Sequence, residues 1–413
     1  MLDIWQTNGQ TSHQLFYRKS RYACKYLQPN HPLGILRSLI EAQFPSFTYL
    51  NSLSPIVSTH QNFDELGFPP DHPGRSVTDS YYLNQTTMLR THTSAHEIDT
   101  FRQGHEKWLL TADVYRRDEI DASHSPVFHQ VEGARTFSVS QSEMDVLKQD
   151  NEALQTCLAS TNILIEDNTK ISPTNPWQDI HHPAHAELVA ANLKHHLNSL
   201  IYSLFSSGRN DAEPLRVRWI EAYFPFTSPS YEVEVFFQGK WLEILGCGVV
   251  KQRTLDLAGA ELFWLLCLCI HFVHHFRMPQ IGVPNRISWA FGLGLERIAM
   301  VLFSIPDIRL FWSTDPRFLD QFKQGKITSF HSYSRFPPCY KDVSFWTAGK
   351  DHDRVHDNDF CDVVRDVAGG LVEDVKLVSD LSALTQDHFK LTFTDRSTSS
   401  STRKRGGQAY AIV

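Results

Sequence analysis

Two glycines separated by one residue are followed closely by an arginine near residue 290. The stretch reads Trp289-Ala-Phe-Gly-Leu-Gly-Leu-Glu-Arg297. A strand that ends on Gly292 and Gly294 can bring its backbone against a flat ligand, because glycine has no side chain to obstruct it. A helix that starts there carries Arg297 in its first turn, at the end that attracts anions. The pattern predicts a nucleotide-binding element, although Gly-x-Gly before a helix is more often an ordinary turn.

A second constellation of chemical groups lies upstream, on two segments with strand character. Gln130 and Glu132 point to one face of a strand, and Arg116 on a paired strand lies opposite them. The segment from Glu119 to Pro126 is eight residues long and contains His124. It is long for a tight hairpin, which predicts a loop that closes over a ligand. Two amphipathic strands with solvated charges would give the same pattern.

These residues carry a family resemblance. Arg116 with Phe128-His-Gln-Val-Glu132 resembles motif 2 of class II aminoacyl-tRNA synthetases, and Gly292-Leu-Gly-Leu-Glu-Arg297 resembles their motif 3. Leu89-Arg-Thr-His-Thr-Ser94, Tyr223-Phe-Pro-Phe226 and Trp289-Ala-Phe-Gly292 are similar, more narrowly, to phenylalanyl-tRNA synthetases. The resemblance is closest to the single-chain mitochondrial form and spans roughly residues 28 to 394. It implies a ligase that attaches L-phenylalanine to tRNA(Phe) in an ATP-dependent reaction, through a phenylalanyl-adenylate.

Activation of an amino acid by ATP involves almost no proton transfer, so its catalysis depends on positioning and on stabilising charge at phosphorus. The resemblance implies that Arg116 bridges the substrate carboxylate and the α-phosphate, because a guanidinium holds two oxygens at once. It also implies that Arg297 contacts the γ-phosphate and adenine and that His124 contacts the phosphates. These three are the expected catalytic residues, and Phe128 and Gly294 complete the expected ATP site.

Glu243 is the expected Mg²⁺ ligand at the ATP site, because hard divalent cations prefer carboxylate oxygens and ATP supplies others. A solvated charge on a strand is the alternative interpretation of Glu243. His181, His182 and His185 lie close together in the sequence, but no second group of ligands accompanies them. The sequence therefore predicts no metal site at these histidines.

The polar part of the amino-acid site is implied by the resemblance. It assigns the amino group and carboxylate of phenylalanine to His92, Ser94, Gln130 and Glu132, together with the arginine of motif 2. Glu132 is expected to match the charge of the ammonium group.

The apolar part of the pocket is expected around Phe224 and Phe226. These residues alternate across Pro225, so strand geometry puts both rings on one face, where they can hold an aromatic ring. Ordinary core packing would explain them equally well without the resemblance. Ala290 is expected beneath the para position of the substrate, with Gly292 beside it, so that tyrosine is rejected sterically.

Helices and strands must position these residues. A helix is expected from His31 to a stop at Pro45, and another over about residues 184–205. The expected fold class is α+β, with the class II synthetase antiparallel β-sheet flanked by helices and a ferredoxin-like α+β C-terminal anticodon-binding domain. In that last domain, a strand at 342–346, a helix at 359–368 and strands at 371–377 and 389–393 fit a split β-α-β order. The pattern stops there, so this domain is predicted to be incomplete.

Four segments follow from this organisation. Residues 1–28 are an N-terminal arm or transit-like segment, and 29–325 are the class II catalytic domain. Within that domain, 138–177 is predicted to be a polar surface insertion, and 261–281 an atypical apolar insert. Residues 330–394 are the truncated ferredoxin-like domain, and 395–413 are a low-complexity tail.

Composition limits the partners. The net charge of −7 argues against bulk nucleic-acid binding, so tRNA requires a local basic surface. Seven cysteines without a Cys-x-x-Cys pair indicate reduced thiols. The apolar stretch from Leu262 to Phe276 has 15 residues, too few for a membrane span, and no membrane partner is predicted. The resemblance further implies a monomer that binds tRNA(Phe), L-phenylalanine and ATP, with Mg²⁺.

Location and activity leave alternatives open. The first forty residues contain five basic side chains and one acid, which fits either a transit peptide or a basic arm. The resemblance favours the mitochondrial matrix over the cytoplasm. The insert at 261–281 is a buried helix, or a product of an unremoved intron or an isoform. With the incomplete C-terminal domain, it leaves a catalytically impaired synthetase-like isoform, which binds ligand or RNA without turnover, as the alternative to an active ligase.

Overall fold

The chain forms two compact units. The computed structural model describes residues 24–206, 213–259, 286–333, 339–346, 356–368, 372–381 and 386–393. The first unit consists of the chain up to Asp118 together with 123–331, and the second of 119–122 together with the residues from 332 onwards. The chain therefore enters the second unit at Glu119, returns to the first at Ser123, and enters the second again after His331.

An eight-stranded mixed sheet is the centre of the first unit, with the order β1-β4-β5-β10-β9-β8-β7-β6. Its six inner strands pair antiparallel, whereas β1 and β6 pair parallel at the two edges. The strands are β1 (Thr48–Leu50), β4 (Lys107–Tyr115), β5 (Val127–Ser138), β6 (Ile163–Asp167), β7 (Leu215–Ala222), β8 (Thr227–Phe237), β9 (Lys240–Val250) and β10 (Arg286–Gly294). The predicted α+β fold with a largely antiparallel sheet is confirmed, and the parallel edge strands add to it.

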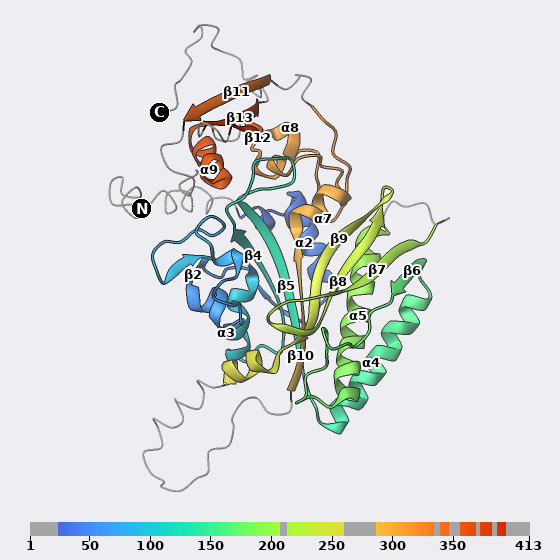
Figure 1. Cartoon of the computed structure of the whole chain (residues 1–413). Coiled ribbons are helices and arrows are strands. Elements are labelled where there is room, and N and C mark those ends of the chain that lie inside the picture. The colour runs from blue at the N-terminus through green and yellow to red at the C-terminus, as the bar shows by residue number, and fades with distance from the viewer. Residues whose placement is uncertain are drawn as a thin grey trace, which may run out of the picture. The chain divides into compact units, whose positions relative to one another are not determined.

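One face of this sheet is covered by helices. Figure 1 shows α4 (Gln141–Ala159) and α5 (Pro183–Phe205) side by side along the sheet. Asn192 of α5 accepts a hydrogen bond from Trp289 Nε1 at 3.0 Å, and Asn198 accepts one from Trp219 Nε1 at 3.1 Å. Because successive strand residues point to opposite faces, the neighbour of Trp289, Ala290, belongs to the other face. That second face carries the predicted site residues.

The expected helix after His31 is confirmed as α2 (Pro32–Ala42). The His31 side chain caps it by accepting from Leu33 N at 3.2 Å, and proline occupies the first turn, where its missing N–H costs nothing. The other elements of this unit are short. They are η2 (Lys25–Leu27), β2 (Ile56–Ser58), η3 (His60–Asp64), η4 (Pro73–Arg75), β3 (Thr87–Leu89), η5 (Thr93–His96), α3 (Glu97–Arg102), α7 (Leu295–Leu302), η6 (Ile308–Trp312), α8 (Pro316–Leu319) and a helix at 252–259.

The polar segment 138–177 contains regular structure. It supplies α4 and the edge strand β6, and α4 buries Met144, Leu147 and Leu158 together with one polar residue, Asn151. A long amphipathic helix with a narrow apolar stripe has a polar composition overall, which explains the prediction of a surface insertion. The segment is an integral part of the sheet and its helical layer.

The second unit has a three-stranded antiparallel sheet with the order β11-β13-β12. Its elements are β11 (Cys339–Trp346), α9 (Asp357–Ala368), β12 (Val372–Leu381) and β13 (Gln386–Phe393). A small apolar core joins Ile120 to Phe360, Cys361, Val364 and Val372. The predicted helix and strands are present, and the ferredoxin-like assignment stays a prediction.

Three predicted features lie outside the described residues: most of the arm at 1–28, the apolar insert at 261–281 and the tail at 395–413. Within the described part of the chain, no helix combines the length and apolar character needed to span a membrane.

Candidate active site

Small residues line up across the open face of the main sheet. The antiparallel register places Gly292 of β10 between Glu132 of β5 and Gly246 of β9, so all three share one face. A Cβ atom added at Gly292 or Gly294 would meet no atom within 4 Å. On the opposite face, by contrast, a Cβ at Gly133 would lie 2.5 Å from the Phe291 ring. The sheet therefore leaves room for a ligand above Gly292 and Gly294.

A polar group borders this room. Ser94 Oγ donates to Glu132 Oε2 at 3.0 Å, and Thr93 N donates to Gln130 Oε1 at 3.2 Å. The turn η5 therefore presses against β5 and fixes both acceptors. Burial raises the pKa of Glu132 to about 7, and the hydrogen bonds from Thr93 and Ser94 oppose that rise. A buried carboxylate beside free space is suited to a positively charged ligand group.

His92 lies just before this turn. Its ring stacks on Phe68 at 5.5 Å between centroids, with 8° between the planes. Burial, and then the charge of Arg116, lowers the pKa of His92 to about 3. At neutral pH the imidazole is therefore uncharged, and it offers one N–H donor and one acceptor.

Arg116 continues β4 beyond Tyr115, on the same face as Gln130 and Glu132. Its Nε donates to Thr91 O at 2.9 Å, and its guanidinium carbon lies 5.2 Å from the centre of the Phe128 ring. The Phe128 ring and the Nε hydrogen bond together orient the guanidinium, and Nε is the one nitrogen that these contacts occupy. Within the described part of the chain, neither Nη group has a hydrogen-bond partner, so both can hold a pair of anionic oxygens.

The predicted helix after the two glycines is present as α7, with Gly294 immediately before it and Arg297 in its first turn. Arg297 Nη1 lies 3.5 Å from Glu243 Oε2, and the two side chains are 62% and 52% exposed. Such an exposed ion pair contributes little to stability, so both groups can turn towards a ligand.

Glu243 belongs to an acidic group on two adjacent strands. It pairs with Glu234 across β8 and β9, and burial together with Glu243 and Glu234 raises the pKa of Glu232. One or two carboxylates suffice to hold a hard divalent cation when phosphate oxygens complete its coordination. Within the described residues, no three His, Cys, Asp or Glu side chains are arranged to hold a metal by themselves.

His124 is exposed in the chain between β4 and β5, with its Nδ1 3.2 Å from Ser123 Oγ. The preceding residues 119–122 belong to the second unit, whereas His124 belongs to the first. Its predicted contact with phosphates stays a prediction.

The strand geometry expected at Phe224 and Phe226 is wrong. Residues 223–226 form a turn between β7 and β8, because Pro225 has no N–H to pair with a neighbouring strand. The two rings nevertheless stack, with centroids 6.1 Å apart and 23° between planes. A Cβ at Gly246 would lie 2.6 Å from the Phe224 ring, so that ring rests directly on the open face.

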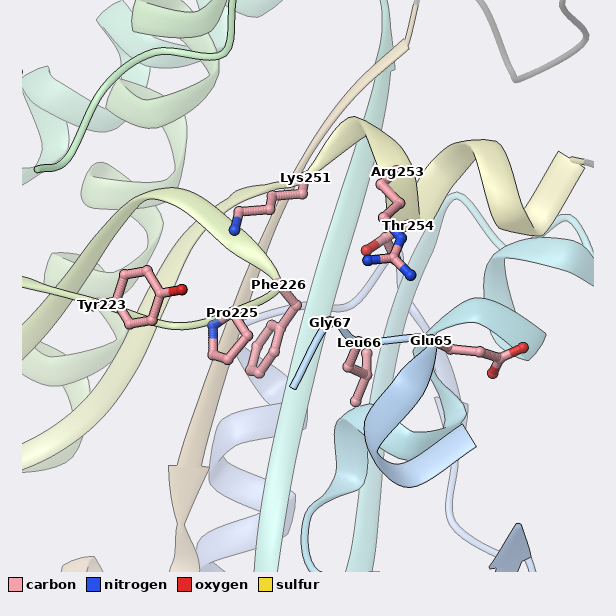
Figure 2. A pocket seen from close by; sticks show the side chains of 9 residues that line it. All are labelled: Glu65, Leu66, Gly67, Tyr223, Pro225, Phe226, Lys251, Arg253 and Thr254. Carbon is pink, nitrogen blue, oxygen red and sulfur yellow. The ribbon is translucent and has the colours of Figure 1, made fainter. Parts of the chain in front are cut away.

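A cavity of about 210 Å³ lies on the far side of this turn. Figure 2 shows its nine lining residues, which are Glu65, Leu66, Gly67, Tyr223, Pro225, Phe226, Lys251, Arg253 and Thr254. Phe226 is the one predicted site residue in this lining. The cavity therefore adjoins the predicted aromatic wall, and neither Gly292 nor Gly294 lines it.

Two buried carboxylates near the site were not predicted from the sequence. Glu296 Oε2 accepts from His129 N at 2.8 Å and its Oε1 lies 2.5 Å from His129 Nδ1, which joins α7 to β5. The second is Glu97, at the start of α3. One sequence signal could have indicated a buried carboxylate at Glu296, namely a charged residue in an otherwise apolar helical run that includes Leu295 and Ile298.

The geometry can be compared with known proteins. The family model described as tRNA synthetases class II core domain (F) matches residues 22–170 and 182–322. The chain is 41% identical to a Saccharomyces cerevisiae protein named phenylalanine–tRNA ligase, mitochondrial, over 86% of this chain and 79% of that protein. A Mus musculus protein of the same name is 42% identical over 85% of this chain and 71% of its own length. An Arabidopsis thaliana protein named phenylalanine–tRNA ligase, chloroplastic/mitochondrial, is 41% identical, with 88% and 71% covered.

Proposed function

This chain belongs to the phenylalanine–tRNA ligases with a class II core, and we propose that it attaches L-phenylalanine to tRNA(Phe) in the mitochondrial matrix. One structural observation carries the proposal. Ser94, Gln130 and Glu132 converge beside the free space above Gly292, where an amino acid can lie flat on the sheet. The free Nη groups of Arg116 stand on the same face.

In the proposed reaction, the substrate carboxylate attacks the α-phosphate of ATP and pyrophosphate leaves. Arg116 holds the carboxylate and the α-phosphate in line and stabilises the charge that builds up on the phosphate oxygens. Glu132 and Gln130 orient the ammonium group, with His92 at the edge of the site. Mg²⁺, held by Glu243, would neutralise charge on the phosphates.

The nucleotide is proposed to bind along β5 and α7. Phe128 and Arg297 would lie on either side of adenine, Gly294 would allow its close approach, and Arg297 and His124 would contact the outer phosphates. Support comes from the exposed, weakly paired guanidinium of Arg297 and from the empty space over Gly294.

Binding of tRNA(Phe) and a monomeric state complete the proposal, and the monomer rests on the resemblance to single-chain enzymes alone. The impaired alternative has no support in the described structure, since its arguments lie at 261–281 and in the C-terminal tail. Arg116, Glu132, Glu243 and Arg297 are all placed on or beside the open face.

Charging of tRNA(Phe) with labelled phenylalanine tests the whole function. The full chain is expected to charge tRNA(Phe) with phenylalanine in the presence of ATP and Mg²⁺, and to charge it at least about 100-fold more slowly with tyrosine. Adenylate formation without any transfer to tRNA would contradict the second half of the proposal.

The pocket itself is tested by Ala290→Gly. Ala290 is buried between Ala134 and Gly248, next to the free space over Gly292. Removing its methyl group should admit para-chlorophenylalanine and raise its activation rate relative to phenylalanine by about tenfold, the scale of one methylene in a pocket. Parallel changes for both amino acids in pyrophosphate exchange would show that Ala290 does not lie beneath the para position.

A further inference from the structure

Glu97 is a buried carboxyl group that neither the sequence motifs nor the proposed mechanism uses. It begins α3 immediately after η5, and its backbone N–H donates to Ser94 O. Its side chain is 1% exposed. Among the described residues, neither of its carboxyl oxygens has a hydrogen-bond partner. An isolated buried acid of this kind is costly unless a ligand or a proton compensates it.

The Glu97 carboxyl lies within electrostatic reach of Glu132. Burial first, and then the charge of Glu132, raises the pKa of Glu97 well above its usual value. Ser94 donates to Glu132 from the turn just before Glu97, so the segment that carries Glu97 also contacts the Glu132 carboxylate. Two buried carboxyl groups that repel each other in this way ionise together more readily when a cation lies between them.

Within the described part of the chain, no basic side chain forms an ion pair with Glu97 or Glu132. Arg90 is a fully buried arginine seven residues before Glu97, and its guanidinium is already paired with Asp113 at 2.6 Å. Arg116 donates through Nε to Thr91 O, and its Nη groups are assigned to the substrate carboxylate and the phosphate rather than to these two carboxyl groups. A primary ammonium group fits the arrangement, because it carries one positive charge and three donors that need separate acceptors.

We propose that Glu97 is a further substrate-binding residue, which accepts a hydrogen bond from the ammonium group of the amino acid together with Glu132. This inference rests on the proposed function and adds a specificity element to it. With two carboxyl groups at the ammonium end, the site selects α-amino acids over acids of the same shape that lack the amino group.

Two ligands separate this role from a structural one. L-Phenylalaninol keeps the ammonium group and lacks the carboxylate, whereas hydrocinnamate keeps the carboxylate and lacks the ammonium group. In titration calorimetry with the full chain, Glu97→Gln is expected to weaken phenylalaninol binding about 10- to 100-fold, the range for a hydrogen bond to a charged group, and to leave hydrocinnamate unchanged. In pyrophosphate exchange, KM for phenylalanine should rise while KM for ATP stays constant.

Asp99→Asn is the matched control, because it removes another carboxylate from the same helix. The Asp99 carboxylate accepts hydrogen bonds from Gln61 and Arg102. This variant should change neither affinity. If Glu97→Gln does not fold, Glu97→Asp, which keeps the charge on a shorter side chain, gives the same comparison.

Equal weakening of both ligands, or unchanged phenylalaninol binding in the Glu97 variant, would overturn the role of Glu97 and leave the proposed function intact. Failure of the unaltered chain to bind phenylalaninol and to exchange pyrophosphate would overturn the proposed function as well. The two failures are therefore distinguishable.

Discussion

Arg116→Lys is expected to lower the rate of phenylalanine-dependent pyrophosphate exchange by roughly 100-fold or more, about 3 kcal/mol, the scale of losing one preorganised contact to developing charge. Lysine keeps the positive charge. It cannot keep the Nε bond to Thr91 O at 2.9 Å and also present two further donors in one plane. The loss should therefore fall on kcat more than on either KM, because the two Nη groups act on the reacting phosphate.

Arg37→Lys on α2 is the control for this substitution. Arg37 is a partly buried arginine paired with Glu41 at 3.6 Å, it has no part in the proposed mechanism, and its replacement should leave exchange unchanged. Near-normal exchange in Arg116→Lys would remove Arg116 from the mechanism.

Glu296→Ala is expected to lower the free energy of unfolding of the first unit by about 3–5 kcal/mol, the usual range for breaking a buried pair. Glu296 and His129 are 2% and 1% exposed, and the carboxylate accepts from both the backbone and the ring of His129. The alanine variant leaves two buried N–H groups without a partner and loosens α7 from β5. Urea unfolding followed by tryptophan fluorescence measures this loss.

Glu187→Ala on the exposed side of α5 is the matched control, and it should change stability by less than about 0.5 kcal/mol. A loss below about 1 kcal/mol in Glu296→Ala would mean that the pair does not hold the two motifs together.

The local parts of the site were predictable from the sequence. Gly294 and Arg297 are three residues apart, so the start of a helix alone fixes where Arg297 lies. Gln130 and Glu132 share a face through the period of a strand. These arguments need no knowledge of tertiary structure. The structure shows the helix start and the shared strand face, and the roles of the four residues stay proposals.

Relations across the chain could not be predicted. Glu296 and His129 are 167 positions apart, and nothing in either segment names the other. Glu97 could not be predicted as a site residue, because its link to the site depends on the contact between η5 and β5. The turn at Pro225 was missed because alternating phenylalanines resemble a strand, although proline removes the donor that a strand needs.

The chain after β4 shows the same limit. Its length predicted a loop that closes over a ligand. In the structure, residues 119–122 belong to the second unit, where Ile120 O accepts from Val375 N at 3.0 Å and Glu119 O accepts from Arg365 Nη2 at 2.7 Å. A local sequence pattern cannot predict packing against residues more than 240 positions away. The closure of this segment over a ligand stays a prediction.

Amino-acid-dependent exchange of pyrophosphate into ATP tests the central claim most directly, because it reports adenylate formation without tRNA. The full chain with Mg²⁺ is expected to exchange pyrophosphate with phenylalanine and to exchange it at least about 100-fold more slowly with tyrosine, the discrimination of a close-fitting pocket. No exchange with phenylalanine, by folded protein that binds ATP, would contradict the assignment of Arg116, Glu132 and Arg297 to an active site.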